Sequence, residues 1–221
     1  MNIENNVRMF LSTRKPSEAN SSFDFCFNYF SCMRKNIAEE ENIVLSCLHL
    51  GFYLASWGMY RGSCKIRNKS FLFFKELMHL ISQEDWSGLW EIDVDCYNSE
   101  NNLTLLMNFK KRLKGFLNTA GVSPTPTLTS KIMLGLFGNI PAFDEKFKQG
   151  SRHNDSWFGE DWNRKSLEKI HIFYWKNREE INNLQSNIYT INSDGQRTEI
   201  KYTKAKIIDM AFFVEGGGLD L

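Results

Sequence analysis

Apolar residues recur at steps of three and four positions through most of this 221-residue chain, which is the spacing of residues on one face of an α-helix. The pattern is clear in six stretches, residues 21–35, 39–62, 69–81, 103–117, 164–183 and 204–214. Within the second of these the apolar stripe consists of Val44, Leu45, Leu48, Phe52, Ala55 and Met59. The periodicity therefore predicts a mainly α-helical protein.

Residues 188–202 break the helical pattern and alternate between polar and apolar side chains instead. They are centred on Asp194-Gly195, a pair that accepts the positive φ of a tight turn, so we expect a small β-hairpin there. No internal repeat or domain-boundary linker is visible, which predicts a single compact multi-helix domain over residues 21–221. Residues 1–20 are polar and lack the apolar core of a signal peptide, and we interpret them as a flexible N-terminal arm.

Composition argues against membrane-spanning, disulfide-bonded and zinc-binding proteins. An apolar share of 42% suffices for a sizeable core, and the chain has no run of about 18 uncharged apolar residues, so we expect no membrane partner. The cysteines follow neither a CxxC nor a metal-finger spacing, which predicts reduced thiols, a cytoplasmic location, no disulfide and no metal or other cofactor. They are Cys26, Cys32, Cys47, Cys64 and Cys96. The sequence leaves the oligomeric state open.

Positive charge is concentrated in the middle of the chain. Residues 106–170 carry eleven basic and six acidic side chains, whereas residues 1–105 and 171–221 each carry a slight acidic excess. An anionic partner would be attracted to the basic region, but charge alone favours the simpler interpretation of ordinary solvated helix faces.

The most distinctive stretch is Thr119 to Arg152, which lies inside this basic region. A turn rich in Gly, Pro and Thr leads into an apolar helix carrying Lys131, then a Gly-Asn break, then Pro141-Ala142-Phe143-Asp144. This order places a carboxylate at the start of a new helix behind a rigid turn. Asp144 is therefore a candidate catalytic group, with a role as a cap of its own helix as the alternative.

The same stretch resembles the helix-hairpin-helix DNA glycosylase superfamily. Residues 120–124 (AGVSP) are similar to the hairpin, residues 129–132 (TSKI) to the start of the next helix, and residues 140–144 (IPAFD) to the turn that presents the catalytic aspartate. Ser123 replaces the second hairpin glycine, and Lys131 lies closer to the aspartate than the family's lyase lysine does. Leu54 to Gly62 also resembles an uncharacterised group of bacterial proteins, a likeness that implies no activity.

The glycosylase resemblance implies a monofunctional enzyme that cleaves the base–sugar bond of a damaged or modified nucleotide flipped out of DNA. Asp144 would stabilise positive charge on the sugar, and both base-excision repair and defence against phage would fit. The side chains implied in DNA binding are Lys110, Lys111, Arg112, Lys131, Lys146, Lys148, Arg152, Arg61, Trp157 and Trp162, with Phe158 and Trp175 as further aromatic candidates.

The competing hypothesis is a non-catalytic helical module that docks a nucleic acid or a protein. Under it, the tryptophans are core or docking residues and the basic side chains form a surface. The two hypotheses differ in geometry. An enzyme should hold Asp144 at the floor of a concave basic pocket, whereas a docking module would leave it on a convex surface.

Overall fold

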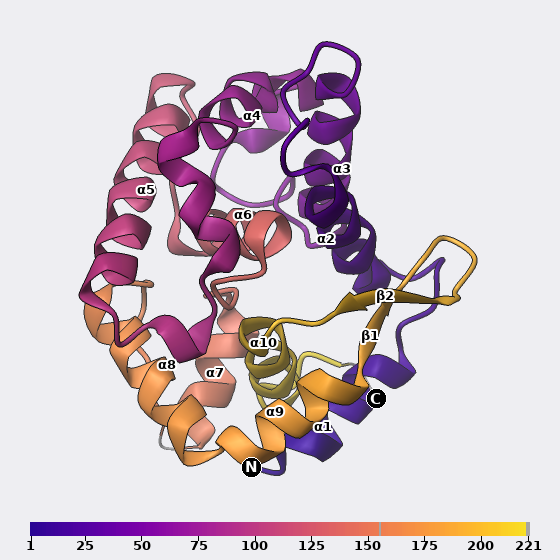
Figure 1. Ribbon diagram of the computed structural model, residues 1–221, viewed down its shortest axis with the longest axis vertical. Coiled ribbons are helices and arrows are strands. Elements are labelled where there is room, and N and C mark those ends of the chain that lie inside the picture. Colours follow the sequence, from indigo (N-terminus) through magenta and orange to yellow (C-terminus); the bar gives the residue numbers. More distant parts are fainter. Residues whose placement is uncertain (155, 220–221) are drawn as a thin grey trace.

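The computed structural model describes residues 1–154 and 156–219, which form a mainly α-helical single domain with one β-hairpin (Figure 1). The helices are α1 (Ile3–Ser12), α2 (Ser22–Met33), α3 (Ile43–Ser56), α4 (Lys75–Ile81), α5 (Glu100–Thr119), α6 (Pro126–Phe137), α7 (Glu145–His153), α8 (Arg164–Lys176), α9 (Arg178–Asn187) and α10 (Lys204–Glu215). The strands are β1 (Tyr189–Ile191) and β2 (Arg197–Lys201). Short 3₁₀ turns, the longest over Glu84–Glu91, join some of these elements.

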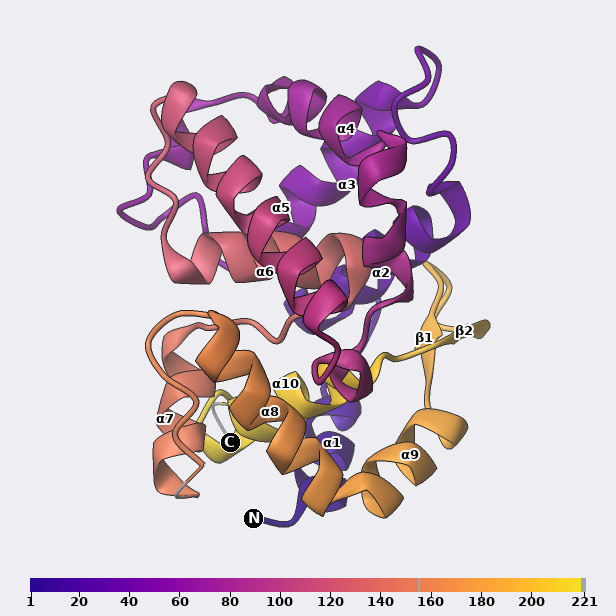
Figure 2. The same ribbon diagram turned by 60° about the vertical axis from the view of Figure 1, so that its left-hand side comes forward.

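The helices are arranged in two tiers. Helices α2 to α6 form one tier, and α1 together with α7 to α10 forms the other (Figure 2). A single cluster of buried apolar residues runs through both tiers, so they share one hydrophobic core. The segment between α6 and α7 crosses from one tier to the other, and Asp144 lies at its end. Among the described residues, no helix is both long and apolar enough to cross a membrane.

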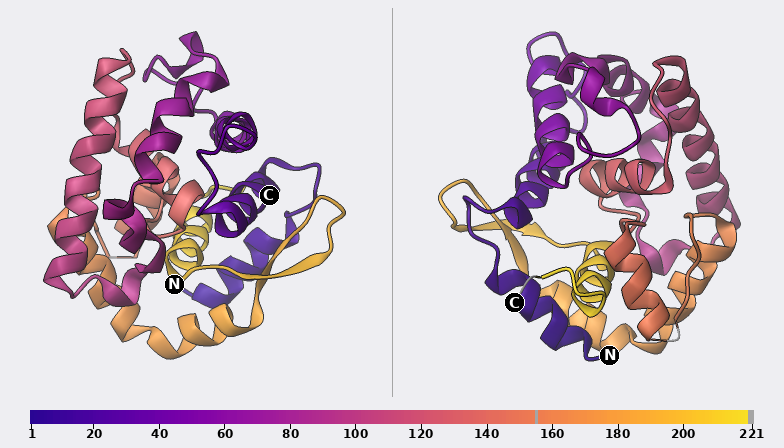
Figure 3. Two further views of the ribbon diagram at one scale, coloured as in Figure 1. Left: turned by 45° about the horizontal axis from the view of Figure 1, so that its top comes forward. Right: turned by 180° about the vertical axis from the view of Figure 1, so that it is seen from behind.

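The prediction of a flexible arm over residues 1–20 is wrong for its first half. Asn2 caps α1, which lies alongside α10 (Figure 3), and Ile3, Val7 and Phe10 are buried between them. The side-chain amide of Asn6 donates hydrogen bonds to the carbonyl oxygen of Ala211 and to Glu215. Apolar residues spaced by four and three positions give this polar segment a buried face.

Three predicted helices also differ in extent. The helix expected over residues 39–62 spans only Ile43–Ser56, because residues 39–42 and 57–61 form turns. The helix expected over residues 69–81 is α-helical only over Lys75–Ile81, after a 3₁₀ turn over Phe71–Phe74. The helix expected over residues 164–183 is divided at Asn177, whose side-chain amide donates to the carbonyl oxygen of Phe173 and so competes with continuation of α8. The hairpin prediction is confirmed: β1 and β2 pair antiparallel, and Gly195 has φ +77° in the turn.

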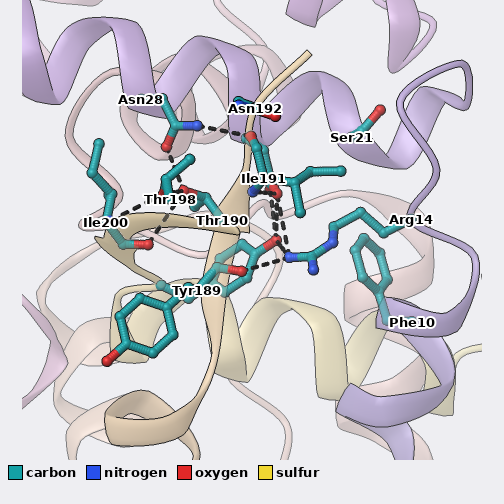
Figure 4. Close-up of polar contacts among 12 residues, drawn as sticks. Phe10, Arg14, Ser21, Asn28, Tyr189, Thr190, Ile191, Asn192, Thr198 and Ile200 are labelled. Atoms are coloured by element: carbon teal, nitrogen blue, oxygen red, sulfur yellow. Dashed lines mark hydrogen bonds and ion pairs between the residues drawn. The ribbon is translucent and has the colours of Figure 1, made fainter. Parts of the chain in front are cut away.

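A buried aspartate anchors the hairpin to α1 and α2. The Asp24 carboxylate accepts hydrogen bonds from the backbone N–H of Ile191 (2.9 Å) and from the Tyr202 hydroxyl (2.6 Å), and it pairs with the Arg14 guanidinium (3.3 Å). Figure 4 shows Arg14 reaching from the end of α1 to the carbonyl group of Tyr189. Burial outweighs these partners and raises the pKa of Asp24 from 3.8 to about 6.

Helices α7 and α10 touch backbone to backbone. A Cβ atom on Gly150 of α7 would overlap the carbonyl oxygen of Phe212, and one on Gly216 would overlap the carbonyl oxygen of Lys146. Both positions therefore require glycine for lack of space. This close packing fixes α7, and with it Asp144, against α10.

The α7–α10 contact predicts that Gly150→Ala destabilises the fold, by about 3 kcal/mol or more, because an added methyl group must push the two backbones apart. Gly115→Ala is the matched control, since a Cβ at this position of α5 meets nothing within 4 Å. In a helix interior it should stabilise by roughly 0.5–1 kcal/mol. Urea unfolding of both variants checks this, and equal effects would contradict it.

The raised pKa of Asp24 predicts a pH dependence of stability. The folded state holds this proton more tightly than the unfolded state, so the contribution of Asp24 falls as pH rises from about 4 to about 6 and is constant above. The loss amounts to roughly 2–3 kcal/mol. Comparing urea unfolding of the wild type and Asp24→Asn at several pH values isolates it. As pH rises from about 4 to about 6, the free energy of unfolding of the wild type should fall relative to that of the variant. Parallel pH profiles would refute the raised pKa of Asp24.

Candidate functional site

The loop that presents Asp144 is held by side chains from both tiers. Helix α6 ends at Gly138, which has a left-handed conformation (φ +67°). The backbone N–H of Phe143 then donates to the Ser130 hydroxyl (2.8 Å), and that of Ala142 donates to the Asp209 carboxylate (2.9 Å). Since Ser130 lies on α6 and Asp209 on α10, the loop is fixed at both sides.

Asp144 is the N-cap of α7. One of its carboxylate oxygens accepts the backbone N–H of Phe147 (3.0 Å), and the other accepts the Lys131 ammonium (2.8 Å). Burial alone would raise the pKa of Asp144, but attraction to Lys131 and the two hydrogen bonds outweigh it and hold the pKa below 3.8. The side chain keeps 16% of its surface exposed. The structure thus holds an ionised carboxylate in a mostly buried position.

Lys131 approaches Asp144 from α6, and its side chain is only 4% exposed. Its ammonium lies 4.6 Å from the centre of the Trp57 ring, a favourable cation–π distance. Trp57 ends α3, and its indole N–H is buried with no hydrogen-bond partner among the described residues. Asp144, Lys131 and Trp57 therefore bring together three elements at the boundary between the tiers.

A second buried lysine–aspartate pair lies beside the first. On α10, Lys206 donates to Asp209 (2.7 Å), and both side chains are buried. The Lys206 ammonium lies 4.7 Å from the ring centre of Phe23 and 5.6 Å from that of Trp57. Its charge also helps to lower the pKa of Asp144. Trp57 is thus shared by two ammonium groups.

This second pair is not among the residues predicted from the sequence, although the sequence contains a signal for it. Lys206 and Asp209 are three positions apart within the otherwise apolar run Ala205 to Phe213, where they lie on one face of a helix. A helix that is apolar on all sides is buried, and a charged residue in such a helix needs a partner of opposite charge close by. Two opposite charges on one face therefore indicate a buried ion pair.

Three of the residues predicted to bind DNA, Lys110, Lys131 and Trp162, lie in the interior instead, and the Lys131 ammonium is already bound to Asp144. Trp162 is fully buried, and its indole N–H donates to the Thr129 hydroxyl (3.0 Å). Lys110 donates to the carbonyl oxygen of Trp162 and pairs with Asp161 (2.8 Å). Burial lowers the pKa of Lys110, against the effect of Asp161. In this structure none of the three side chains presents a surface to a nucleic acid. Phe158 is likewise buried, among the rings of Phe147, Phe173 and Phe212.

A second group of predicted residues gathers on the exposed side of α7. Lys148 and Arg152 both pair with Glu160, at 3.3 and 2.6 Å, and both approach Glu145. The Arg152 guanidinium also lies 4.3 Å from the ring centre of Trp157. This surface therefore combines two cations, two carboxylates and one partly exposed indole.

The remaining candidates are separate from this surface. Lys111 and Arg112 are exposed on α5, Lys146 is half-buried on α7, Arg61 is exposed in the turn after α3, and Trp175 is exposed on α8. Surface cavities lie at the end of α1 and between α2 and α3, and Asp144 lines neither of them. Within residues 1–154 and 156–219, no group of three or more His, Cys, Asp or Glu side chains could hold a metal ion.

Comparison with protein-family models, curated proteins and solved structures found no match to this chain.

The buried Lys131–Asp144 pair predicts a strong coupling in stability. Asp144→Asn keeps the helix cap but leaves the Lys131 ammonium buried without a counter-charge, which should cost about 3–5 kcal/mol. The double variant Lys131→Met/Asp144→Asn removes both charges and should recover most of this loss. Urea unfolding of the wild type, both single variants and the double variant gives the coupling free energy. Additive effects would mean that the pair contributes nothing.

Proposed function

We propose that this protein is a monofunctional DNA N-glycosylase with Asp144 as its catalytic carboxylate. One observation carries the proposal: the carboxylate is ionised and mostly buried, yet 16% of its side chain remains open to solvent at the boundary of two helical tiers. The order of helix, turn, helix and capping aspartate along residues 100–153 agrees with the resemblance to the helix-hairpin-helix glycosylases.

The chemistry follows from charge. Breaking a base–sugar bond builds positive charge on the sugar ring. A carboxylate held in one position, in surroundings of low dielectric constant, stabilises that charge strongly. The lowered pKa of Asp144 keeps the group ionised at neutral pH and makes it a weak base. The proposed role is therefore electrostatic stabilisation of the sugar cation, more than removal of a proton from water.

Lys131 has a supporting role in this proposal. It keeps Asp144 ionised in the absence of substrate and orients one carboxylate oxygen at 2.8 Å. The N-terminus of α7 holds the other oxygen. The exposed edge of the carboxylate is the part that can face the sugar of a substrate. Base release by a monofunctional enzyme needs no covalent step on Lys131.

The exposed side of α7 is the proposed contact with the DNA backbone. Glu145 and Glu160 are exposed, and ion pairs with exposed carboxylates contribute little free energy, so phosphates can replace them as partners of Lys148 and Arg152. Trp157, beside Arg152, supplies an aromatic face. Lys111 and Arg112, exposed on α5, are not part of this contact, and Lys110 and Trp162 act only in the interior.

A second candidate function is a helical docking module without catalysis. Two observations favour it: a cap and an ion pair already account for both oxygens of Asp144, and Asp144 lines neither of the cavities described above. Under this alternative, the α7 surface would bind DNA or another polyanion, and Asp144 would serve stability alone.

The test is base release from duplex and single-stranded oligonucleotides that carry a panel of damaged and naturally modified bases, followed by alkaline cleavage of abasic sites. The wild type should release at least one base, and Asp144→Asn should lower the rate by about 10²-fold or more. Asp24→Asn is the control, because it alters a buried, ion-paired aspartate that does not contact Asp144. All variants are assayed at a temperature at which circular dichroism shows them folded.

Three outcomes decide between the candidates. Base release that depends on Asp144 but not on Asp24 supports the glycosylase. Binding of the oligonucleotides without base release from any of them supports the docking module. Full activity in Asp144→Asn would remove the proposed catalytic role of this carboxylate.

A further inference from the structure

Helix α3 exposes an apolar stripe that nothing in the described part of the chain covers. Ile43 to Ser56 contains no Asp, Glu, Lys or Arg, and its large exposed side chains are Val44 (47%), Leu45 (47%), Leu48 (41%) and Phe52 (64%). The opposite face, with Cys47, Leu50, Tyr53 and Leu54, is buried against the protein. The stripe identified in the sequence therefore faces solvent, and the core contact is made by the other side of the helix.

The exposed side chains have the spacing of a helix–helix seam. Leu45, Leu48, Phe52 and the exposed Ala55 follow one another at steps of three, four and three residues, which is the spacing of inward positions in a two-helix coiled coil. A groove between α2 and α3 extends the apolar surface sideways, with Phe25, Tyr29 and Met33 in its lining. A continuous apolar surface of this kind is typical of a protein interaction site.

The two ends of α3 carry opposite charges. Glu39, Glu40 and Glu41 precede the helix and are exposed. Arg61 follows it, is exposed, and has no ion pair within the described residues, with its guanidinium close to Gly58 at the end of the helix. A partner that matches this surface is an apolar helix with its basic end beside Glu39–Glu41 and its acidic end beside Arg61.

Helix α3 itself fits that description when turned around. In an antiparallel register that sets Leu48 opposite Phe52, Leu45 lies opposite Ala55, so a large side chain meets a small one. The same antiparallel arrangement brings the acidic turn that precedes one α3, Glu39–Glu41, to the end at which the partner's Arg61 follows its α3. A two-fold axis repeats every one of these contacts, as in most symmetric dimers.

We propose that α3 is a homodimer interface on which a second copy of this chain packs its own α3 antiparallel. The exposed seam forms the apolar centre, and the Glu39–Arg61 contacts, one on each side, set the direction. This proposal is independent of the glycosylase function. It assigns Arg61 to the partner copy instead of to DNA.

Sedimentation velocity over a range of protein concentrations tests the proposal. The wild type should show a reversible monomer–dimer equilibrium. Phe52→Glu should raise the dissociation constant by about 30-fold or more, the effect of losing a central contact. Ile172→Glu is the matched control, because Ile172 is also an exposed apolar residue (53%) but lies on α8, and it should leave the equilibrium unchanged.

Charge reversal tests the direction of packing. Arg61→Glu should weaken the dimer, and Glu39→Arg/Arg61→Glu should restore it, because the double variant exchanges the two charges. A monomer at every concentration, or a dimer that survives Phe52→Glu, overturns the interface. An effect of Ile172→Glu as large as that of Phe52→Glu would also overturn it. A double reversal no better than the single one overturns the antiparallel register.

Discussion

The ring of Trp57 lies beside two buried lysine–aspartate pairs, and this junction joins the two tiers of the protein. Lys131 and Lys206 both approach the ring, at 4.6 and 5.6 Å from its centre. The aspartates that pair with them also bind backbone groups. Asp144 caps α7, and Asp209 accepts a hydrogen bond from the backbone of the loop that leads to α7. Buried charges are tolerated only with close partners. Helices α3, α6, α7 and α10 are therefore constrained together, and moving one of them would separate a charge from its partner.

This constraint explains why Asp144 differs from an ordinary helix cap. A cap needs only one accepting oxygen and is normally solvated. Here the second oxygen is bound to an ammonium that is itself nearly excluded from water, so the carboxylate stays ionised in an environment that would otherwise favour its protonation. In the proposed glycosylase the same arrangement would serve reactivity as well as stability, since a carboxylate already desolvated and oriented has little reorganisation left before it faces a developing cation. The cap and the ion pair do not require that 16% of the Asp144 side chain stay exposed to solvent.

Local patterns predicted the fold class, the positions of most helices, the hairpin and the placement of Asp144 at a helix start, because each depends on neighbouring residues. The partners of these elements depend on residues far apart in sequence. Lys131 meets Asp144 through a turn between two helices, and Trp57 reaches both lysines from α3. Trp162 carries no local sign of complete burial. The N-terminal segment has the composition of a flexible arm because its three buried apolar residues lie among mostly polar ones, a pattern that stabilises a helix only once α10 is beside it.

Helix α3 shows where periodicity stops being informative. A stripe of apolar residues indicates an inward face only when the other face is polar, and α3 is apolar on both. One face is covered by this chain. The other is exposed to water and apolar, which is typical of an interaction surface. Because Trp57 ends the same helix, the exposed seam and the ring beside Lys131 belong to one rigid element. A partner packed on α3 would restrict the axis of that helix and hence the position of the ring. In this way the proposed interface and the proposed site, which stand on separate observations, share a mechanical link.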